Sequence, residues 1–227
     1  MITNLLADIT FFQYAEATFL TLKITLLGTL FAYIIGVPLG IILYGTADGS
    51  LFPNKAVNII LGVIVNIFRS IPFIILLVLT QPVAKLLIGT KIGNDAFIIY
   101  LTIAATPFVA RVIESSFNET NSGVIEAAQS MGASNLSIII KVIIPESKSS
   151  LLLGAAIALT TILGYTPMAY LIAGGGLGTM SVLYGLYRFN KPVMYISSVL
   201  LVVIVNIIQI IFSETSKLTD KRIRNRK

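Results

Sequence analysis

The sequence predicts an all-helical integral membrane protein with five spanning helices, and three observations predict this fold. Apolar residues make up 56% of the 227 residues and charged residues only 11%, whereas soluble domains carry roughly 25% charged residues. The mean hydropathy is +0.93. Five stretches contain the ~20 mostly apolar residues that a helix needs to cross ~30 Å of hydrocarbon. Because no internal repeat or low-complexity tract interrupts them, a single membrane domain over residues 1–227 is the simplest partition.

The first predicted span covers residues 18–44. Lys23 lies near one end, where its long side chain can reach the membrane interface. Further along, the sequence GVPLG places Gly36, Pro38 and Gly40 within the span. This pattern indicates either a kink or a close helix contact, and small residues at four-residue spacing favour the contact.

The second and third predicted spans cover residues 56–80 and 94–113. Arg69 falls inside the second span, where a guanidinium costs at least ~2.5 kcal/mol on insertion scales unless it finds water or a partner. One interpretation is structural, with Arg69 bound to a helix-end carbonyl or to Glu114. The other interpretation is that Arg69 guides a substrate carboxylate.

The fourth and fifth predicted spans cover residues 150–172 and 191–212. The fourth contains Pro167, which removes one backbone hydrogen bond, and is followed by the glycine-rich stretch AGGGLG. The fifth leads into the basic tail KLTDKRIRNRK, which carries six basic residues and one acid.

The basic tail predicts that the C-terminus is cytoplasmic, because basic residues next to spans concentrate on the inner side. With five spans, the N-terminus then lies outside. The N-terminal segment agrees, since it holds Asp8 and Glu16 but no basic residue before Lys23. Basic residues on the predicted inner side, the tail apart, are Lys55, Arg111, Lys141 and Lys148, and those on the outer side are Lys85, Lys91, Arg188 and Lys191. We therefore interpret the tail as a topology anchor, with contact to a cytoplasmic partner or anionic lipid as the alternative.

The composition also argues against several classes of function. The chain has no Cys and no His, so it lacks thiolate metal ligands, the commonest metal ligand and the usual general base. No secretory signal peptide is expected at the N-terminus. The net charge of +6 is concentrated in the tail beside a span, which favours membrane topology over nucleic-acid binding. No phosphate-binding GxxxxGK[ST] sequence is present, so any ATP must be bound by another chain.

Residues 114–149 form the longest internal connection, on the predicted cytoplasmic side between spans three and four. A helix should begin near Asn121 or Ser122, with Glu126 early in it. Gly132 should end this helix, and Ser134 should cap a second one that ends before Pro145. Helix physics alone leaves two interpretations open, a plain amphipathic connector and a protruding recognition element.

The spacing of this connection resembles the EAA signature of ABC importer permeases. The match consists of Glu126, Ala127 and Ala128, then Gly132 after three intervening residues, then Val142, Ile144 and Pro145. Val142 and Ile144 stand where the family usually has Ile and Leu. By this resemblance, Glu126, Ala127, Ala128, Gly132, Ile144 and Pro145 belong to a coupling helix that docks in a groove of an ATPase subunit.

The resemblance extends to NIFRSIPFIILL, TTILGYTPMAYLIAGGGLG and YGLYRF, which are similar to the methionine-importer branch of the family. It implies a multi-pass permease of the bacterial inner membrane that imports methionine as a homodimer. The implied partners are a second copy, two ATPase subunits that bind ATP and magnesium, an external substrate-binding lipoprotein and membrane lipid, with no nucleic acid. The chain itself is not expected to be an enzyme or to bind a cofactor or metal.

Further residues are candidates for the pathway and for docking. Met168, Tyr165 and Arg69 are pore or gate candidates, since Met168 by resemblance occupies a narrow gate on the two-fold axis. Methionine is otherwise ordinary core filler. The glycines of AGGGLG indicate either a flexible exit from span four or a close docking surface for the binding protein; they are Gly174, Gly175, Gly176 and Gly178.

Other functions remain as alternatives. One alternative to methionine import is that the same architecture transports another small amino acid or a short peptide. A passive channel would not need the EAA loop. An intramembrane enzyme would need converging titratable side chains inside the spans, and only Arg69 lies deep in one.

Overall fold

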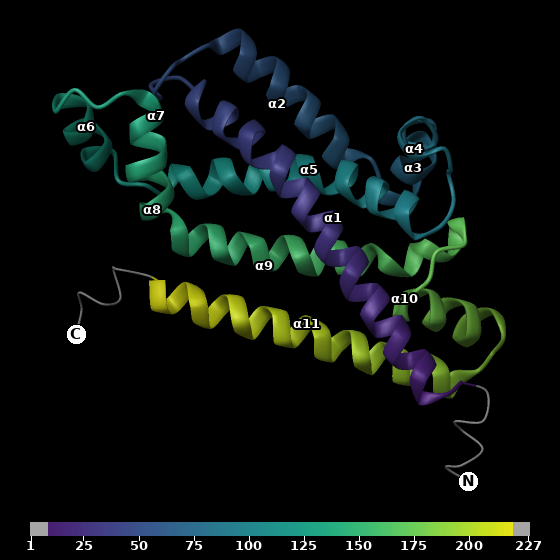
Figure 1. Ribbon diagram of the computed structural model, residues 1–227. Helices are drawn as coiled ribbons and strands as arrows, with labels where there is room; N and C mark the ends of the chain where they lie inside the picture. The colour runs from purple at the N-terminus through teal and green to yellow at the C-terminus, as the bar shows by residue number, and fades with distance from the viewer. Residues whose placement is uncertain (1–8, 220–227) are drawn as a thin grey trace. The chain divides into compact units, whose positions relative to one another are not determined.

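The computed structural model describes residues 9–219, and every regular element within that range is helical, as predicted (Figure 1). Asp8 and tail residues 220–227, on which the predicted orientation partly rests, lie outside the described residues. In chain order the elements are α1 (Phe11–Gly45), α2 (Lys55–Ser70), α3 (Phe73–Leu79), α4 (Gln81–Ile88), α5 (Asn94–Asn118), α6 (Ser122–Ser130), α7 (Asn135–Ile138), η1 (Ile139–Ile143), α8 (Ile144–Glu146), α9 (Lys148–Tyr165), η2 (Thr166–Ile172), α10 (Leu177–Met180), η3 (Ser181–Tyr187) and α11 (Lys191–Thr219).

Four helical segments among the described residues are long and apolar enough to cross a membrane. They are α1, α5, α11 and the segment Lys148–Ile172 that α9 and η2 form together. Each extends beyond at least one end of the predicted span, because the helices continue into more polar residues. They overlap the predicted spans one, three, four and five.

Residues 56–80 do not form the one continuous helix that was expected. α2 ends at Ser70, α3 begins at Phe73, and the two are bent by 108°. Pro72 lies at the break with φ −56° and ψ 139°. Its ring has no amide hydrogen and disfavours the helical conformation of Ile71 before it, so the helix cannot continue. The chain therefore has five spans only if this bent pair counts as one.

The helices pack as two compact units, and each is described by itself. Unit 1 comprises residues 9–32, 71–105 and 159–209, and unit 2 comprises residues 33–70, 106–158 and 210–219.

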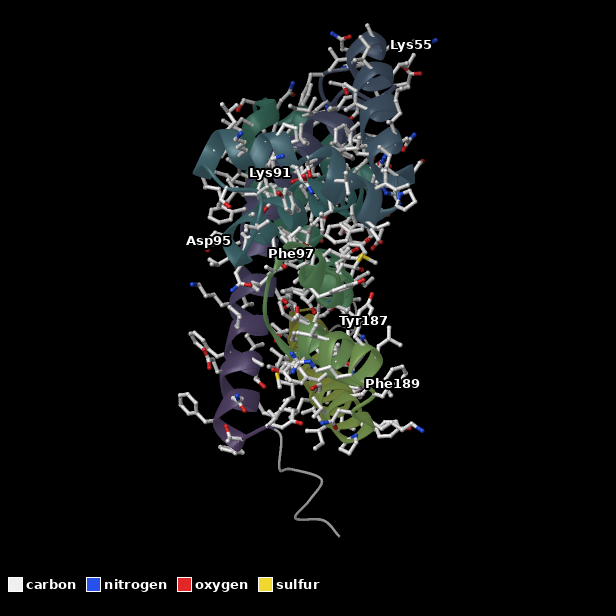
Figure 2. All side chains as sticks on the ribbon, turned by 90° about the vertical axis from the view of Figure 1, so that its right-hand side faces the viewer. Lys55, Lys91, Asp95, Phe97, Tyr187 and Phe189 are labelled. Carbon is white, nitrogen blue, oxygen red and sulfur yellow. The ribbon has the colours of Figure 1, made fainter. Side chains whose placement is uncertain are left out.

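Unit 1 has an aromatic centre around Phe73. The Phe73 ring stacks on Tyr165 at a centroid distance of 4.4 Å and meets the buried Phe97 edge-on at 5.9 Å. Phe189, which follows η3, instead projects from the unit and is 82% exposed (Figure 2). Aromatic pairs of this geometry fix the start of α3 against α5 and the end of α9.

Unit 2 uses the predicted glycine pair as a close helix contact. A Cβ added at Gly36 would lie 2.8 Å from Val109, and one added at Gly40 would lie 2.6 Å from Ile113 and 2.7 Å from the Ala110 carbonyl oxygen. Glycine is therefore required for α1 to approach α5 this closely. The contact interpretation of GVPLG is confirmed.

Candidate functional site

The candidate coupling loop lies in unit 2 and begins with α6. Asn121 caps this helix, since its side-chain oxygen accepts a hydrogen bond of 2.8 Å from the Gly123 amide. Asn is among the preferred residues at this position because it satisfies an amide that has no partner inside the helix. The predicted helix start at Asn121 or Ser122 is confirmed.

Gly132 ends α6 in the predicted way. Its φ is +77°, its amide donates to the Gln129 carbonyl at 2.9 Å, and the Ala133 amide donates to the Ala128 carbonyl at 3.1 Å. These two bonds form a Schellman motif, which requires a left-handed residue at the Gly132 position. An added Cβ at Gly132 meets nothing within 4 Å, so glycine is required here for its backbone and not for space.

Ser134 caps the second helix, accepting a 3.4 Å hydrogen bond from the Ser137 amide as predicted. The expectation that this helix ends before Pro145 is wrong, because the chain remains helical through Glu146. The five-residue π segment η1 precedes Pro145, and the Ile144 amide reaches back to the Ile139 carbonyl. This wider turn accommodates a residue that lacks an amide hydrogen and whose ring crowds the preceding turn.

The two helices expose one set of residues and bury another. Glu126, Ala127 and Pro145 are exposed, whereas Ala128 is buried and Ile144 half-buried. Four large apolar side chains of the loop are also more than two-fifths exposed: Val124 43%, Met131 81%, Leu136 66% and Ile140 53%. Exposed apolar side chains gathered on one short segment are typical of a protein contact surface.

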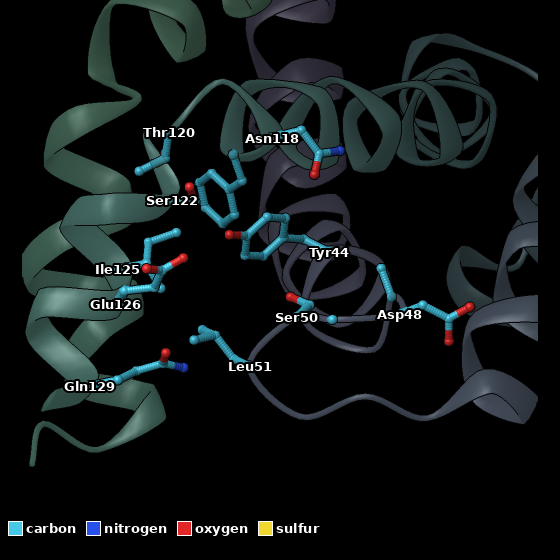
Figure 3. Close-up of a pocket in the computed structure, with 13 residues that line it drawn as sticks. Tyr44, Asp48, Ser50, Leu51, Asn118, Thr120, Ser122, Ile125, Glu126 and Gln129 are labelled. Atoms are coloured by element: carbon cyan, nitrogen blue, oxygen red, sulfur yellow. The ribbon is translucent and has the colours of Figure 1, made fainter.

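A small pocket of about 240 Å³ separates α6 from the turn that follows α1. Figure 3 shows the Tyr44 side chain reaching toward α6, with Glu126 and Gln129 on the opposite wall. Tyr44 packs edge-on against Phe117 of α5 at 5.5 Å. Candidate coupling residue Glu126 therefore faces a cavity on one side while remaining exposed.

Hydrogen bonds tie the loop to the rest of unit 2. The Asn135 side-chain amide donates to the Leu51 carbonyl at 2.9 Å, which links α7 to the turn between α1 and α2. At the base of the loop, the Thr120 and Ser147 hydroxyls lie 3.0 Å apart. A movement of the loop would therefore reach α1 and α2 as well as α5 and α9.

A second cluster of hydroxyl side chains anchors α9 beside the base of the loop. Ser150 donates to Ser116 at 3.1 Å and to Glu119 at 3.0 Å, and the Ser149 and Ser216 hydroxyls lie 2.7 Å apart. Sequence reasoning missed these residues. The serine-rich stretch ESKSS was the available signal, but it does not identify the distant partners.

The pore candidates Tyr165 and Met168 belong to unit 1. Tyr165 ends α9 and stacks on Phe73, and the chain then tightens into the 3₁₀ helix η2, in which Met168 is half-buried. A 3₁₀ segment inside a spanning helix marks a place of strain or function. The gate assignment of Met168 stays a prediction.

The third pore candidate, Arg69, lies in unit 2 in the last turn of α2 and is exposed. The proposed pairing of Arg69 with Glu114 is not present. Instead Arg111 Nη1 holds Glu114 Oε2 at 2.7 Å, and Arg111 Nη2 donates to the Gly62 carbonyl at 3.2 Å and to Asn66 Oδ1 at 3.0 Å. Arg111, which sequence reasoning used only as a topology marker, is therefore the arginine that links α2 to α5.

The candidate docking glycines form a tightly packed turn of unit 1. A Cβ added at Gly174 would lie 2.9 Å from Ala169, one at Gly176 2.7 Å from Thr21, and one at Gly178 2.5 Å from Pro167. The Gly175 amide donates to Asn94 at 2.8 Å. These contacts give the glycines an internal packing role, while a flexible exit from span four and docking of a binding protein at this turn both stay predictions.

No group of three or more potential metal ligands occurs within residues 9–219.

The family model of the binding-protein-dependent transport system inner membrane component matches residues 36–225.

Several known proteins resemble the chain along most of its length. A probable D-methionine transport system permease protein from Vibrio cholerae is 44% identical over 206 residues, which cover 91% of this chain and 92% of that protein. A methionine import system permease protein from Bacillus subtilis is 43% identical over 181 residues, covering 80% and 82%. The solved structure of the MetNI methionine ABC transporter in inward-facing conformations contains a chain that superposes with a TM-score of 0.90 at 38% identity, covering 93% of this chain and 98% of that one.

Proposed function

Since the chain belongs to the family of binding-protein-dependent transport system inner membrane components, we propose that it is the membrane permease subunit of an ATP-driven methionine importer. The curated relatives from Vibrio cholerae and Bacillus subtilis are described as methionine permeases. The superposed solved chain belongs to a methionine ABC transporter. These likenesses support methionine as the substrate.

The observation that carries the proposal is the geometry of the coupling loop. Two short helices are joined by a Schellman turn at Gly132, and both N-termini are capped, by Asn121 and Ser134. The loop exposes Met131 and Leu136. A preformed element with apolar side chains facing outward is suited to insert into a groove of another protein.

In the proposed mechanism, two copies of the chain assemble with two ATPase subunits that bind ATP and magnesium. Closure of the ATPases displaces the loop through Glu126, Ala127 and Gly132. The contacts of Asn135 with the Leu51 carbonyl and of Thr120 with Ser147 pass this displacement to the spanning helices. The pathway between the two copies, gated at Met168 and Tyr165, then opens to accept methionine from an external binding lipoprotein at the turn that contains Gly175.

The proposed orientation places the N-terminus outside and the coupling loop in the cytoplasm. The chain has no Cys, so single cysteines can be introduced without removing any. A membrane-impermeant maleimide should label Phe189→Cys in intact cells and Gln129→Cys only after the membrane is opened. The opposite pattern would invert the topology.

The function is tested with the purified permease–ATPase complex in proteoliposomes, with the binding protein added outside. We expect uptake of radiolabelled methionine that requires ATP and the binding protein, and that excess unlabelled methionine inhibits. Uptake without ATP would identify a passive channel. ATP-dependent uptake of a different amino acid or a peptide, with none of methionine, would show that the substrate assignment is wrong.

A further inference from the structure

A second cavity of unit 2, of about 400 Å³, lies between the end of α2 and one face of α5. Its volume falls within the range of small-molecule sites. The lining residues are Arg69, Phe108, Arg111, Val112, Glu114, Ser115 and Asn118. The cavity shares only Asn118 with the pocket near Glu126.

The charges of this cavity are not balanced. The Arg111 and Glu114 side chains are 26% and 18% exposed and neutralise each other in an ion pair. Arg69 adds a second positive charge, and within residues 9–219 it has no ion pair or hydrogen bond. An unpaired guanidinium in an apolar segment is costly unless an anion or water meets it. The cavity therefore favours a ligand with an anionic group next to Arg69.

One acceptor in the cavity also remains open. The Glu114 carboxylate uses Oε2 for Arg111, and its Oε1 makes no hydrogen bond within the described part of the chain. A carboxylate oxygen can accept further hydrogen bonds, above all from a cationic donor. The cavity thus offers a cation for an anionic group and an acceptor for a cationic one.

The remaining wall is apolar. Phe108 and Val112 are four residues apart on α5, so their side chains lie on the same helix face, and both are half-buried. They give an apolar surface beside the charged groups, as in most small-molecule sites, where a few polar groups orient a largely apolar ligand.

We propose that this cavity binds an α-amino acid with an apolar side chain. Its carboxylate lies against Arg69, its ammonium group against Glu114 Oε1, and its side chain against Phe108 and Val112. A zwitterionic lipid headgroup such as phosphatidylethanolamine also carries an anionic phosphate and an ammonium group that match Arg69 and Glu114, so the experiment below distinguishes a free amino acid from a lipid. The choice of an amino acid rests on the proposed function, and it makes the cavity a substrate-binding site along the transport pathway.

The test uses the permease–ATPase complex in phosphatidylcholine nanodiscs and a methionine analogue with a photoreactive diazirine in its side chain. After illumination, mass spectrometry locates the label. We expect labelling of α5 around Phe108 and Val112, and competition by methionine but not by methioninamide, which lacks the carboxylate, or by N-acetylmethionine, which lacks the ammonium group. Because the label is located by sequence, binding to the ATPase does not interfere.

Arg69→Gln should lower the α5 labelling about tenfold, the loss expected when a charge-assisted hydrogen bond is removed, and Arg69→Lys should retain part of it. The matched control is Arg188→Gln, because Arg188 lies over the Tyr184 ring at 4.7 Å and outside the cavity. Arg188→Gln should label like the wild type. Size-exclusion profiles verify that each variant is folded and assembled.

Two results would overturn the inference. Equal labelling of α5 in the wild type and Arg69→Gln would show that Arg69 does not bind the carboxylate. Absence of amino-acid labelling, together with phosphatidylethanolamine or phosphatidylglycerol that the wild type retains in native mass spectra and Arg69→Gln loses, would identify a lipid site. Methionine uptake measured on the same wild-type preparation separates the two proposals, since uptake without α5 labelling refutes only the cavity assignment.

Discussion

Replacement of Gly132 tests whether the candidate coupling loop depends on its backbone turn or on the small size of the residue. The φ of Gly132 is +77°, and an added Cβ would meet no atom within 4 Å. A left-handed conformation costs a residue other than glycine about 1–2 kcal/mol, with Asn less affected because its side chain can hydrogen-bond locally. A cost of this size lowers the population of the correct turn about 5–30-fold.

Backbone strain and residue size predict different orders of activity. If the turn is decisive, ATP-dependent methionine uptake should fall in the order Gly132, Gly132→Asn, Gly132→Ala, with Gly132→Leu lowest. If only size matters, Gly132→Ala should exceed Gly132→Asn. Uptake is measured in proteoliposomes at equal amounts of assembled complex, and Gly132→Leu should still insert into the membrane.

Gly89 provides the matched control for this series. It has the same φ of +77° and also no neighbour within 4 Å of an added Cβ, but it caps α4 in unit 1. Gly89→Ala should therefore lower thermal stability as Gly132→Ala does, while uptake per folded complex stays near the wild-type value. The reasoning is refuted if Gly132→Ala transports as well as the wild type or better than Gly132→Asn.

Three further predictions follow from local contacts. Asn121→Ala should cost about 1 kcal/mol of helix stability and lower the amount of methionine imported per ATP hydrolysed. Asn121→Asp keeps the cap and should import as much methionine per ATP as the wild type. Equal import per ATP in Asn121→Ala and the wild type would contradict the capping role. Gly40→Ala should lower the thermal unfolding temperature in detergent, because its Cβ would lie 2.6 Å from Ile113. Gly164→Ala should not lower it, because a Cβ there meets nothing within 4 Å. A similar loss of stability in both variants would point to a general effect of removing glycine. Met168→Ala should increase methionine leak from loaded vesicles without ATP if Met168 closes the pathway, and unchanged leak and uptake would remove it from the gate.

Sequence reasoning succeeded where the deciding interactions are local. The caps at Asn121 and Ser134 and the end of α6 at Gly132 each depend on residues no more than five positions away. Such short-range rules can be applied to a sequence without knowing the fold. The same reasoning placed four spans close to their observed helices, because length and hydropathy alone determine whether a helix can cross a membrane.

It failed where two local rules competed. Pro72 and Pro145 were both visible in the sequence, yet one breaks its helix and the other does not. At Pro72 the apolar length of residues 56–80 suggested continuity, but the observed bend is 108°. At Pro145 the π turn of η1 absorbs the proline, and the burial of Ile138 and Ile143, both 0% exposed, favours the helix that continues through it.

The sequence by itself determined that this protein is a membrane protein, that it is helical, and where the helices of the candidate coupling loop begin and where the first of them ends, because composition, hydrophobic length and capping are properties of short segments. Only the tertiary structure decided that Arg111 and not Arg69 pairs with Glu114, and that the glycines at 174, 176 and 178 pack inward. It also revealed that Asn135 holds the turn at Leu51. Arg111 and Glu114 lie three residues apart on α5, but Arg111 also donates to Gly62 and Asn66 of α2. Gly176 and Asn135 contact residues far away in the sequence. Which partner each side chain meets depends on how close the helices approach, and that distance is determined by packing and not by any single segment.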